Sequence, residues 1–172
     1  FCNLDTPGVG VNSGTDALFL GLKTLGIGPG DEVITVANTA VPTVAAIIAA
    51  GARPRFIDID PDTYQMNAGL LAGAVTEKTK CVLPVHLYGQ CGDMDSITST
   101  AKKHGLFVLE DCAQCTGAAH NGQRAGTFGD ISAWSFYPTK VLGAYGDGGM
   151  ITASDPALLE HARSLRMYGM KG

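Results

Sequence analysis

Lys140 has the setting in this sequence that best suits covalent chemistry. It follows Ile131–Phe136, where side chains alternate as in a strand, and Pro138 lies between them. Four glycines come soon after it: Gly143, Gly146, Gly148 and Gly149. Inside a pocket, loss of hydration lowers the pKa of a lysine and leaves a nucleophilic amine that can form a Schiff base. Most lysines are solvated surface residues, so a plain loop lysine is the alternative.

A second candidate site lies where a short strand, Val9–Asn12, runs into a helix. Ser13 and Asp16 are three residues apart, which resembles a capping box with aspartate in place of glutamate. The free N–H groups of such a helix N-terminus suit a phosphate, although an ordinary capped helix has the same pattern. The turn at Gly14 and Thr15 is neither G-x-G-x-x-G nor a P-loop, so no dinucleotide or ATP site is indicated.

Short strands alternate with helices along the chain. The predicted strands are Val9–Asn12, Glu32–Val36, Arg53–Asp58, Cys81–Val85, Phe107–Glu110, Ile131–Phe136 and Met150–Thr152. The predicted helices begin at Ser13, after Asn38–Thr43, at Asn67, at Asp93 and at Ser154 or Asp155. This alternation predicts an α/β fold with three α/β/α layers around a mostly parallel seven-stranded sheet. The last three strands lack long crossover helices, so part of the sheet is expected to be antiparallel.

Polar residues follow several of these strands. They are Ser13–Thr15, Thr39, His86, Asp111–Gln114 and Pro138–Lys140. Ligands of parallel sheets bind beyond the carboxyl ends of the strands, so these groups are expected at one rim. Pyridoxal phosphate needs such a set: a lysine for its aldehyde, N–H and hydroxyl donors for its phosphate, and a carboxylate that keeps its pyridine nitrogen protonated.

Composition argues against several other classes of protein. The 172 residues suffice for one domain, and a net charge of −4 without a basic run argues against nucleic acid as a partner. The longest apolar stretch, Val41–Ala50, is too short to span a membrane. Five cysteines, an odd number, suggest reduced thiols in a cytoplasmic protein. Cys112 and Cys115 form an isolated C-x-x-C, which we interpret as buried small side chains and not as a metal or redox site.

Five motifs resemble those of the DegT/DnrJ/StrS sugar-nucleotide aminotransferases, which are pyridoxal-phosphate enzymes of fold type I. In chain order they are NSGTDAL at Asn12–Leu18, GDEVI at Gly30–Ile34, PVHLYGQ at Pro84–Gln90, EDCAQ at Glu110–Gln114 and SFYPTKVLGAYGDGG at Ser135–Gly149. The resemblance covers nearly the whole chain. It implies that residues 1–172 are the cofactor-binding large domain, without the smaller C-terminal domain and the N-terminal start of the family.

The resemblance implies a role for each matching residue. Lys140 binds the cofactor aldehyde as a Schiff base and then transfers protons, and Asp111 pairs with the pyridinium nitrogen. Gln114 contacts the cofactor ring or its 3′-oxygen. The implied phosphate binders are Gly14, Thr15 and Ser135.

The implied reaction moves an amino group from glutamate or glutamine to a nucleotide-linked keto-sugar. A homodimer is implied too, since in this family an asparagine of the neighbouring subunit completes the phosphate site. One alternative is a sugar dehydratase of the same group, which goes with histidine at the lysine position. The other is a catalytically silent domain for regulation or assembly. Lys140 and Asp111 favour amino transfer over both.

Two positions depart from the family pattern. Many members place an aromatic side chain over the cofactor ring at the position of Ala40, so another residue is expected to pack there. The family's R-N-H-G appears here as R-M-Y-G at Arg166–Gly169, so that loop is expected to differ.

Overall fold

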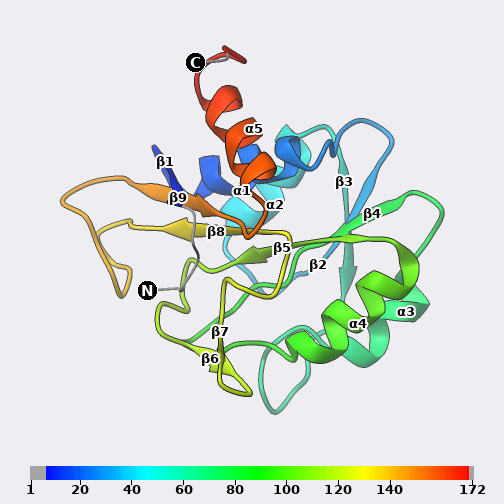
Figure 1. The fold of residues 1–172 in the computed structure, drawn as a ribbon. Helices are drawn as coiled ribbons and strands as arrows, with labels where there is room; N and C mark the ends of the chain where they lie inside the picture. Colours follow the sequence, from blue (N-terminus) through cyan, green and yellow to red (C-terminus); the bar gives the residue numbers. More distant parts are fainter. Residues whose placement is uncertain (1–6, 171–172) are drawn as a thin grey trace.

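A seven-stranded sheet with helices on both faces makes up the computed structural model, which describes residues 7–170 (Figure 1). The sheet consists of β1 (Val9–Val11), β2 (Glu32–Val36), β3 (Arg53–Ile57), β4 (Thr79–Val82), β5 (Phe107–Asp111), β8 (Ile131–Ser135) and β9 (Gly149–Thr152). The helices are α1 (Gly14–Thr24), α2 (Val41–Ala49), α3 (Ala68–Ala74), α4 (Met94–His104) and α5 (Pro156–Arg166). The α/β class and the mostly parallel sheet are thereby confirmed.

The strand order is β1-β9-β8-β5-β4-β2-β3. The strands from β3 to β8 run parallel to their neighbours, whereas β9 is antiparallel to both β8 and β1. The predicted antiparallel part therefore exists, at the β1 edge of the sheet. Because β2, β4, β5 and β8 point the same way, the loops that follow them meet at one edge.

Helices cover the two faces of the sheet in separate groups (Figure 1). α1 packs against both α2 and α5 on one face, and α3 and α4 pack together on the other. α1 buries Ala17, Leu18 and Leu22 and contacts β8 and β9. Each of four helices starts at a side chain that accepts a backbone N–H, at Ser13, Asn67, Asp93 and Asp155. These caps satisfy N–H groups that would otherwise lack partners, which is why the helices begin there.

Two details differ from the sequence prediction. The fourth strand spans Thr79–Val82 and not Cys81–Val85. Leu83 N still donates to Ile34 O at 2.7 Å, but Pro84 has no N–H to donate, and beyond it the chain pairs with β5 through a bridge between Val85 and Asp111. The connection from β5 to β8 carries an unpredicted two-stranded hairpin, β6 (Ala119–His120) and β7 (Gln123–Arg124).

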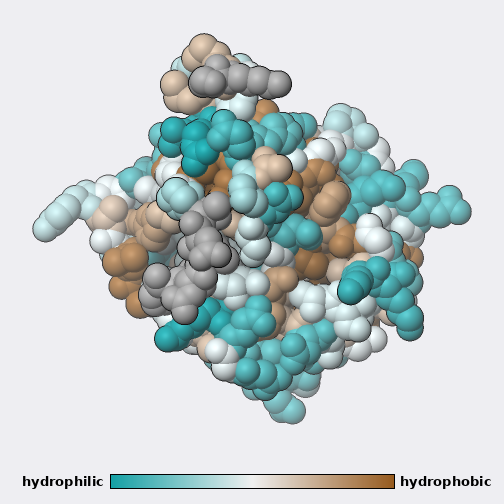
Figure 2. Space-filling model, in the orientation of Figure 1, coloured by the Kyte–Doolittle hydropathy of each residue, from teal (hydrophilic) through white to brown (hydrophobic). Residues whose placement is uncertain are grey.

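The core is one large cluster of apolar side chains between the sheet and the helices, with a small second cluster around Trp134. No helix in residues 7–170 has the length and apolar character that crossing a membrane requires. Some apolar side chains stay exposed, among them Val141 and Leu142 in the loop between β8 and β9. The brown area at the left of Figure 2 lies where Figure 1 places this loop.

Candidate functional site

A cavity of about 220 Å³ lies at the carboxyl ends of the central strands. Five of the six predicted site residues line it: Gly14, Thr15, Asp111, Ser135 and Lys140. The sixth, Gln114, lines an adjoining cavity of about 400 Å³, which shares Lys140 and also contains Tyr88. The structure thus brings the six residues to one edge of the sheet, as the strand-end argument predicts.

The N-terminus of α1 is pressed against β8 and β9. Ser13 Oγ accepts from Asp16 N at 3.1 Å, which is the main bond of the predicted capping box. A side-chain Cβ at Gly14 would lie 2.6 Å from Ser135 Cβ, and one at Gly149 would lie 2.3 Å from Ser13 O. Only glycines permit these approaches, which bring the start of α1 and Ser135 together in the wall of the cavity.

Asp111 ends β5 and is buried at the base of the cavity. Its Oδ1 accepts from Ala113 N at 3.1 Å, and its Oδ2 accepts from Thr43 Oγ1 at 2.8 Å. Burial raises the pKa of Asp111 above the ordinary aspartate value. The two hydrogen bonds and the positive charge of Lys140 oppose this rise without cancelling it. Asp111 is therefore a carboxylate that a cationic or N–H-bearing ligand in the cavity would stabilise.

Lys140 lies in a tight turn of the loop between β8 and β9. Lys140 N donates to Tyr137 O at 2.8 Å, and Ala144 N donates to Phe136 O at 2.7 Å, so the loop folds back on itself. A Cβ at Gly143 would lie 2.7 Å from Pro138 O. Position 143 must therefore be glycine for the loop to pack against Pro138. The half-buried Lys140 lines both cavities.

Gln114 is fixed by the turn that follows β4. Gly89 N donates to Gln114 O at 3.1 Å, and Tyr88 N lies 3.5 Å from Gln114 Oε1. Tyr88 has a φ of 59°, a strained value for a residue with a side chain. Its ring packs edge-on against Tyr64, with 6.3 Å between the ring centroids. These contacts join three loops beside the second cavity, those that follow β3, β4 and β5.

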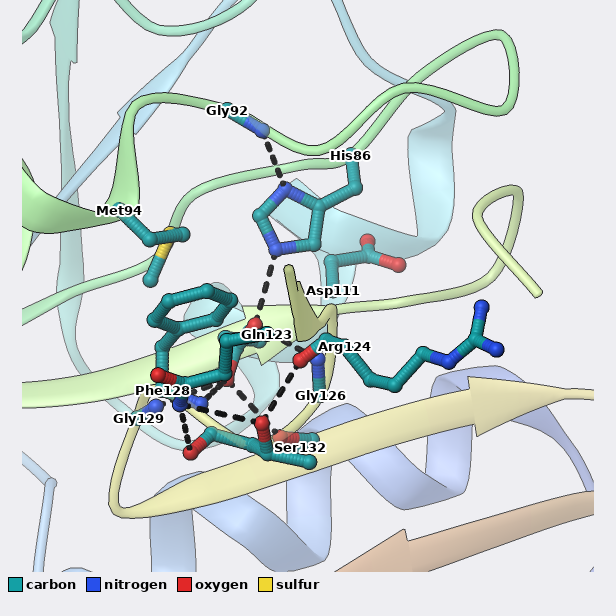
Figure 3. Close-up of polar contacts among 12 residues, drawn as sticks. His86, Gly92, Met94, Asp111, Gln123, Arg124, Gly126, Phe128, Gly129 and Ser132 are labelled. Carbon is teal, nitrogen blue, oxygen red and sulfur yellow. Dashed lines mark hydrogen bonds and ion pairs between the residues drawn. The ribbon is translucent and has the colours of Figure 1, made fainter. Parts of the chain in front are cut away.

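Glu110, the residue before Asp111, is buried at the centre of a hydrogen-bond network. Its partners His86, Gly126, Phe128, Gly129 and Ser132 are labelled in Figure 3. Its Oε1 accepts from Phe128 N at 2.9 Å, Gly129 N at 2.7 Å and Ser132 Oγ at 3.3 Å, and its Oε2 accepts from Gly126 N at 2.8 Å and lies 3.0 Å from His86 Nε2. Burial on its own raises the pKa of Glu110, but the bonds from His86, Gly129 and Gly126 outweigh it and hold the pKa below the ordinary value.

His86 belongs to this network and does not line the cavity, so its predicted place at the rim is wrong. Its side chain is fully buried, and Nδ1 accepts from Gly92 N at 3.2 Å (Figure 3). Nε2 must therefore carry the hydrogen that it donates to Glu110. His86, Glu110 and Cys112 have potential metal-ligating atoms within 4.8 Å of one another. The imidazole nitrogens and carboxylate oxygens already make hydrogen bonds, so the cluster is a structural network.

Sequence reasoning missed several residues of the cavity wall. Thr43 lies outside the five motifs, and Tyr137 and Asp147 lie within the Ser135–Gly149 motif without having been assigned a role, yet all three line the cavity. Ala40 lines it too, at the position where many family members have an aromatic side chain, and offers only a methyl group. Thr43 had one detectable signal, its place in the first turn of a helix that follows a strand.

The C-x-x-C cysteines are buried and unpaired. Cys112 and Cys115 are free thiols with at most 1% of their surface exposed. Burial, reinforced by Cys115 and the neighbouring carboxylates, raises the pKa of Cys112 well above its ordinary value. Their role as small buried side chains is as predicted, while Cys2 lies outside the described residues.

Comparison with known proteins places this geometry among aminotransferases. Residues 4–172 match the model of the DegT/DnrJ/EryC1/StrS aminotransferase family. A curated relative, the dTDP-3-amino-3,4,6-trideoxy-alpha-D-glucose transaminase of Micromonospora megalomicea subsp. nigra, is 52% identical over 163 residues, or 95% of this chain and 44% of the relative.

Two solved structures are similar over nearly the whole chain. DesV of S. venezuelae, in complex with a ketimine intermediate, has a TM-score of 0.95 and 46% identity, covering 99% of this chain and 46% of that one. The ntda protein of Bacillus subtilis, with bound cofactor PMP, has a TM-score of 0.90 and 37% identity, covering 96% of this chain and 37% of that one. The chain thus spans less than half the length of each of these relatives.

Proposed function

This chain belongs to the DegT/DnrJ/EryC1/StrS aminotransferase family, and from that premise we propose that it is the cofactor-binding part of a pyridoxal-phosphate aminotransferase. The amino group comes from glutamate or glutamine and passes to a nucleotide-linked keto-sugar. The observation that carries the proposal is the shared cavity of Lys140, Asp111 and the N-terminus of α1. The Micromonospora relative, named for a dTDP-linked amino-sugar, supports the substrate class.

The residues present fit pyridoxal phosphate. A phosphate suits the N-terminus of α1, where Gly14 keeps the wall free of a side chain and Thr15 and Ser135 add hydroxyl groups. A protonated ring nitrogen suits Asp111, because each oxygen of that carboxylate accepts one hydrogen bond from the protein and has a lone pair left. Such a partner also supplies the positive charge that a buried carboxylate favours.

We assign each residue of the site a separate role in the transfer of the amino group. When bound, the cofactor supplies an electron sink for the carbon that bears the substrate amine. Lys140, which lines both cavities, would hold the cofactor aldehyde through its amine and would carry a proton to and from the reacting carbon. Asp111 holds the proton on the ring nitrogen. Gln114, in the adjoining cavity, orients the ring or its 3′-oxygen.

We extend the proposal to the setting of the enzyme. Residues 1–172 form its large domain, it acts as a homodimer, and it works in the cytoplasm. The exposed Val141 and Leu142 beside the cavity support burial against a second subunit. The free thiols of Cys81, Cys91, Cys112 and Cys115 agree with a reducing compartment.

The test uses the full-length protein loaded with pyridoxal phosphate. Wild type should show a visible absorption band that Lys140→Ala lacks, whereas Lys103→Ala, which removes an exposed lysine on α4, should keep it. Wild type should also transfer an amino group from glutamate or glutamine to at least one member of a panel of keto-sugar nucleotides. A band that survives in Lys140→Ala refutes the lysine assignment. No turnover with any sugar refutes the aminotransferase proposal and leaves a silent domain.

A further inference from the structure

Thr43, which lies outside the sequence motifs, makes a buried hydrogen bond to Asp111. It lies in the first turn of α2 with 1% of its surface exposed, and its Oγ1 donates to Asp111 Oδ2 at 2.8 Å. Thr39 Oγ1 lies 2.7 Å from Thr43 Oγ1. A hydroxyl has one hydrogen, and that of Thr43 goes to Asp111, so Thr39 must be the donor in the second contact. The two threonines therefore form a directed chain of hydrogen bonds that ends on Asp111.

The start of α2 is built to place this chain. Ala40, the residue before the helix, has no side chain that can cap it, and Pro42 stands in the first turn. Thr43 N donates to Ala40 O at 3.2 Å, which sets Thr43 on the side of the helix that faces β5. The hydroxyl of Thr39 does not cap the helix and bonds the hydroxyl of Thr43 instead.

We propose that Thr43, oriented by Thr39, is a positioning residue that fixes the Asp111 carboxylate and keeps it ionised for the ring nitrogen of the cofactor. This inference rests on the proposed function, because that function gives Asp111 its task. The carboxylate is held at both ends, by Thr43 on Oδ2 and by Ala113 N on Oδ1. Thr43 therefore determines the plane in which the carboxylate faces the cavity.

Some surroundings of Asp111 raise its pKa and others lower it. Burial favours the neutral acid and raises the pKa. The groups that favour the carboxylate are the N–H of Ala113, the hydroxyl of Thr43 and the positive charge of Lys140, whereas the nearby His86 ring is uncharged because its Nδ1 accepts from Gly92 N. Of these, the Thr43 hydroxyl can be removed without altering charge or much shape, because valine has nearly the same outline as threonine. Thr43→Val therefore isolates its contribution.

The experiment compares four full-length proteins: wild type, Thr43→Val, Thr43→Ser and Thr35→Val. Thr35 is an equally buried threonine in β2 whose hydroxyl donates to Leu83 O at 2.8 Å, away from the cavity. Infrared difference spectra of the cofactor-free proteins follow protonation of Asp111 with pH, and the band is assigned by its loss in Asp111→Asn. The dissociation constant of pyridoxal phosphate is measured alongside, by the visible band.

In Thr43→Val we expect Asp111 to take up its proton at a higher pH than in wild type. We also expect cofactor binding about tenfold weaker, as for loss of one charge-assisted hydrogen bond. Thr43→Ser should restore both, and Thr35→Val should leave both unchanged. Equal titration and binding in wild type and Thr43→Val overturn the inference while the proposed function stands. Failure of wild type to give a visible band overturns the proposed function, and the inference with it.

Discussion

Among the substitutions considered, Glu110→Gln is expected to cause the largest loss of stability. The side chain keeps its shape but loses its charge, and one acceptor oxygen becomes an NH₂ group. In either orientation the new amide hydrogens face at least two donors: Phe128 N, Gly129 N and Ser132 Oγ at one oxygen, or Gly126 N and His86 Nε2 at the other. Each buried donor left without an acceptor costs about 1–3 kcal/mol. We therefore expect a loss of about 3–5 kcal/mol in the free energy of unfolding.

The stability difference between wild type and Glu110→Gln should also depend on pH. The folded-state pKa of Glu110 is held below its ordinary value. A carboxylate of this kind stabilises the fold fully above its unfolded-state pKa, and this contribution falls as pH drops towards the folded-state pKa. The difference in stability between wild type and Glu110→Gln should therefore be largest near neutral pH and shrink below about pH 4.3.

The assay is equilibrium unfolding in urea across that pH range, with Glu32→Gln as the matched control. Glu32 is also a buried carboxylate at a strand residue, but within residues 7–170 one donor serves it, Thr76 Oγ1 at 2.6 Å. The control should lose about 1 kcal/mol. The reasoning fails if Glu110→Gln loses no more than Glu32→Gln, or if the difference from wild type does not shrink in acid.

Two further predictions concern the packing of the site. Gly149→Ala should cost about 1–3 kcal/mol in the free energy of unfolding, since its Cβ would meet the backbone at Ser13 O, whereas Gly10→Ala, with no atom within 4 Å, should be neutral or slightly stabilising; equal values in urea unfolding would contradict this. Burial raises the pKa of both Cys81 and Cys91 to about 12, so iodoacetamide near neutral pH should modify them only after unfolding, as judged by peptide mass spectrometry. Rapid labelling of folded Cys91 would refute that argument.

The main elements were predictable because each carries a local signal. Ser13 and Asp93 are caps that also begin apolar helical faces, and the buried strand Glu32–Val36 is continuous in apolar and β-branched residues apart from its first position. The hairpin of β6 and β7 was missed because its strands have two residues each. Its turn, Asn121-Gly122, has positive φ at both residues and is a strong hairpin signal that the short strands concealed.

The site was predictable only where topology determines position. Asp111 ends β5 and Lys140 follows β8, and these two strands are parallel neighbours, so strand order alone brings both residues to one edge. Thr43 and Glu110 have roles that depend on partners distant in the chain, such as Asp111 for Thr43 and Gly126 for Glu110. His86 was misplaced for the same reason, because it also follows a strand but turns towards Glu110. Local sequence does not predict which distant residue a side chain will bond to.

The pairing of β1 with β9 bears on how the protein matures on the ribosome. Val9 pairs in register with Ile151, so within residues 7–170 β1 has no sheet neighbour until the chain has been synthesised as far as β9. The turn at Ser13 and Gly14 depends on the same late strands, since Ser135 and Gly149 form the surface against which it packs. Such long-range contacts fold slowly. The nascent chain therefore has the central strands of its sheet before the turn at Ser13 and Gly14 can pack, and a ligand that contacts that turn requires β8 and β9 to be in place.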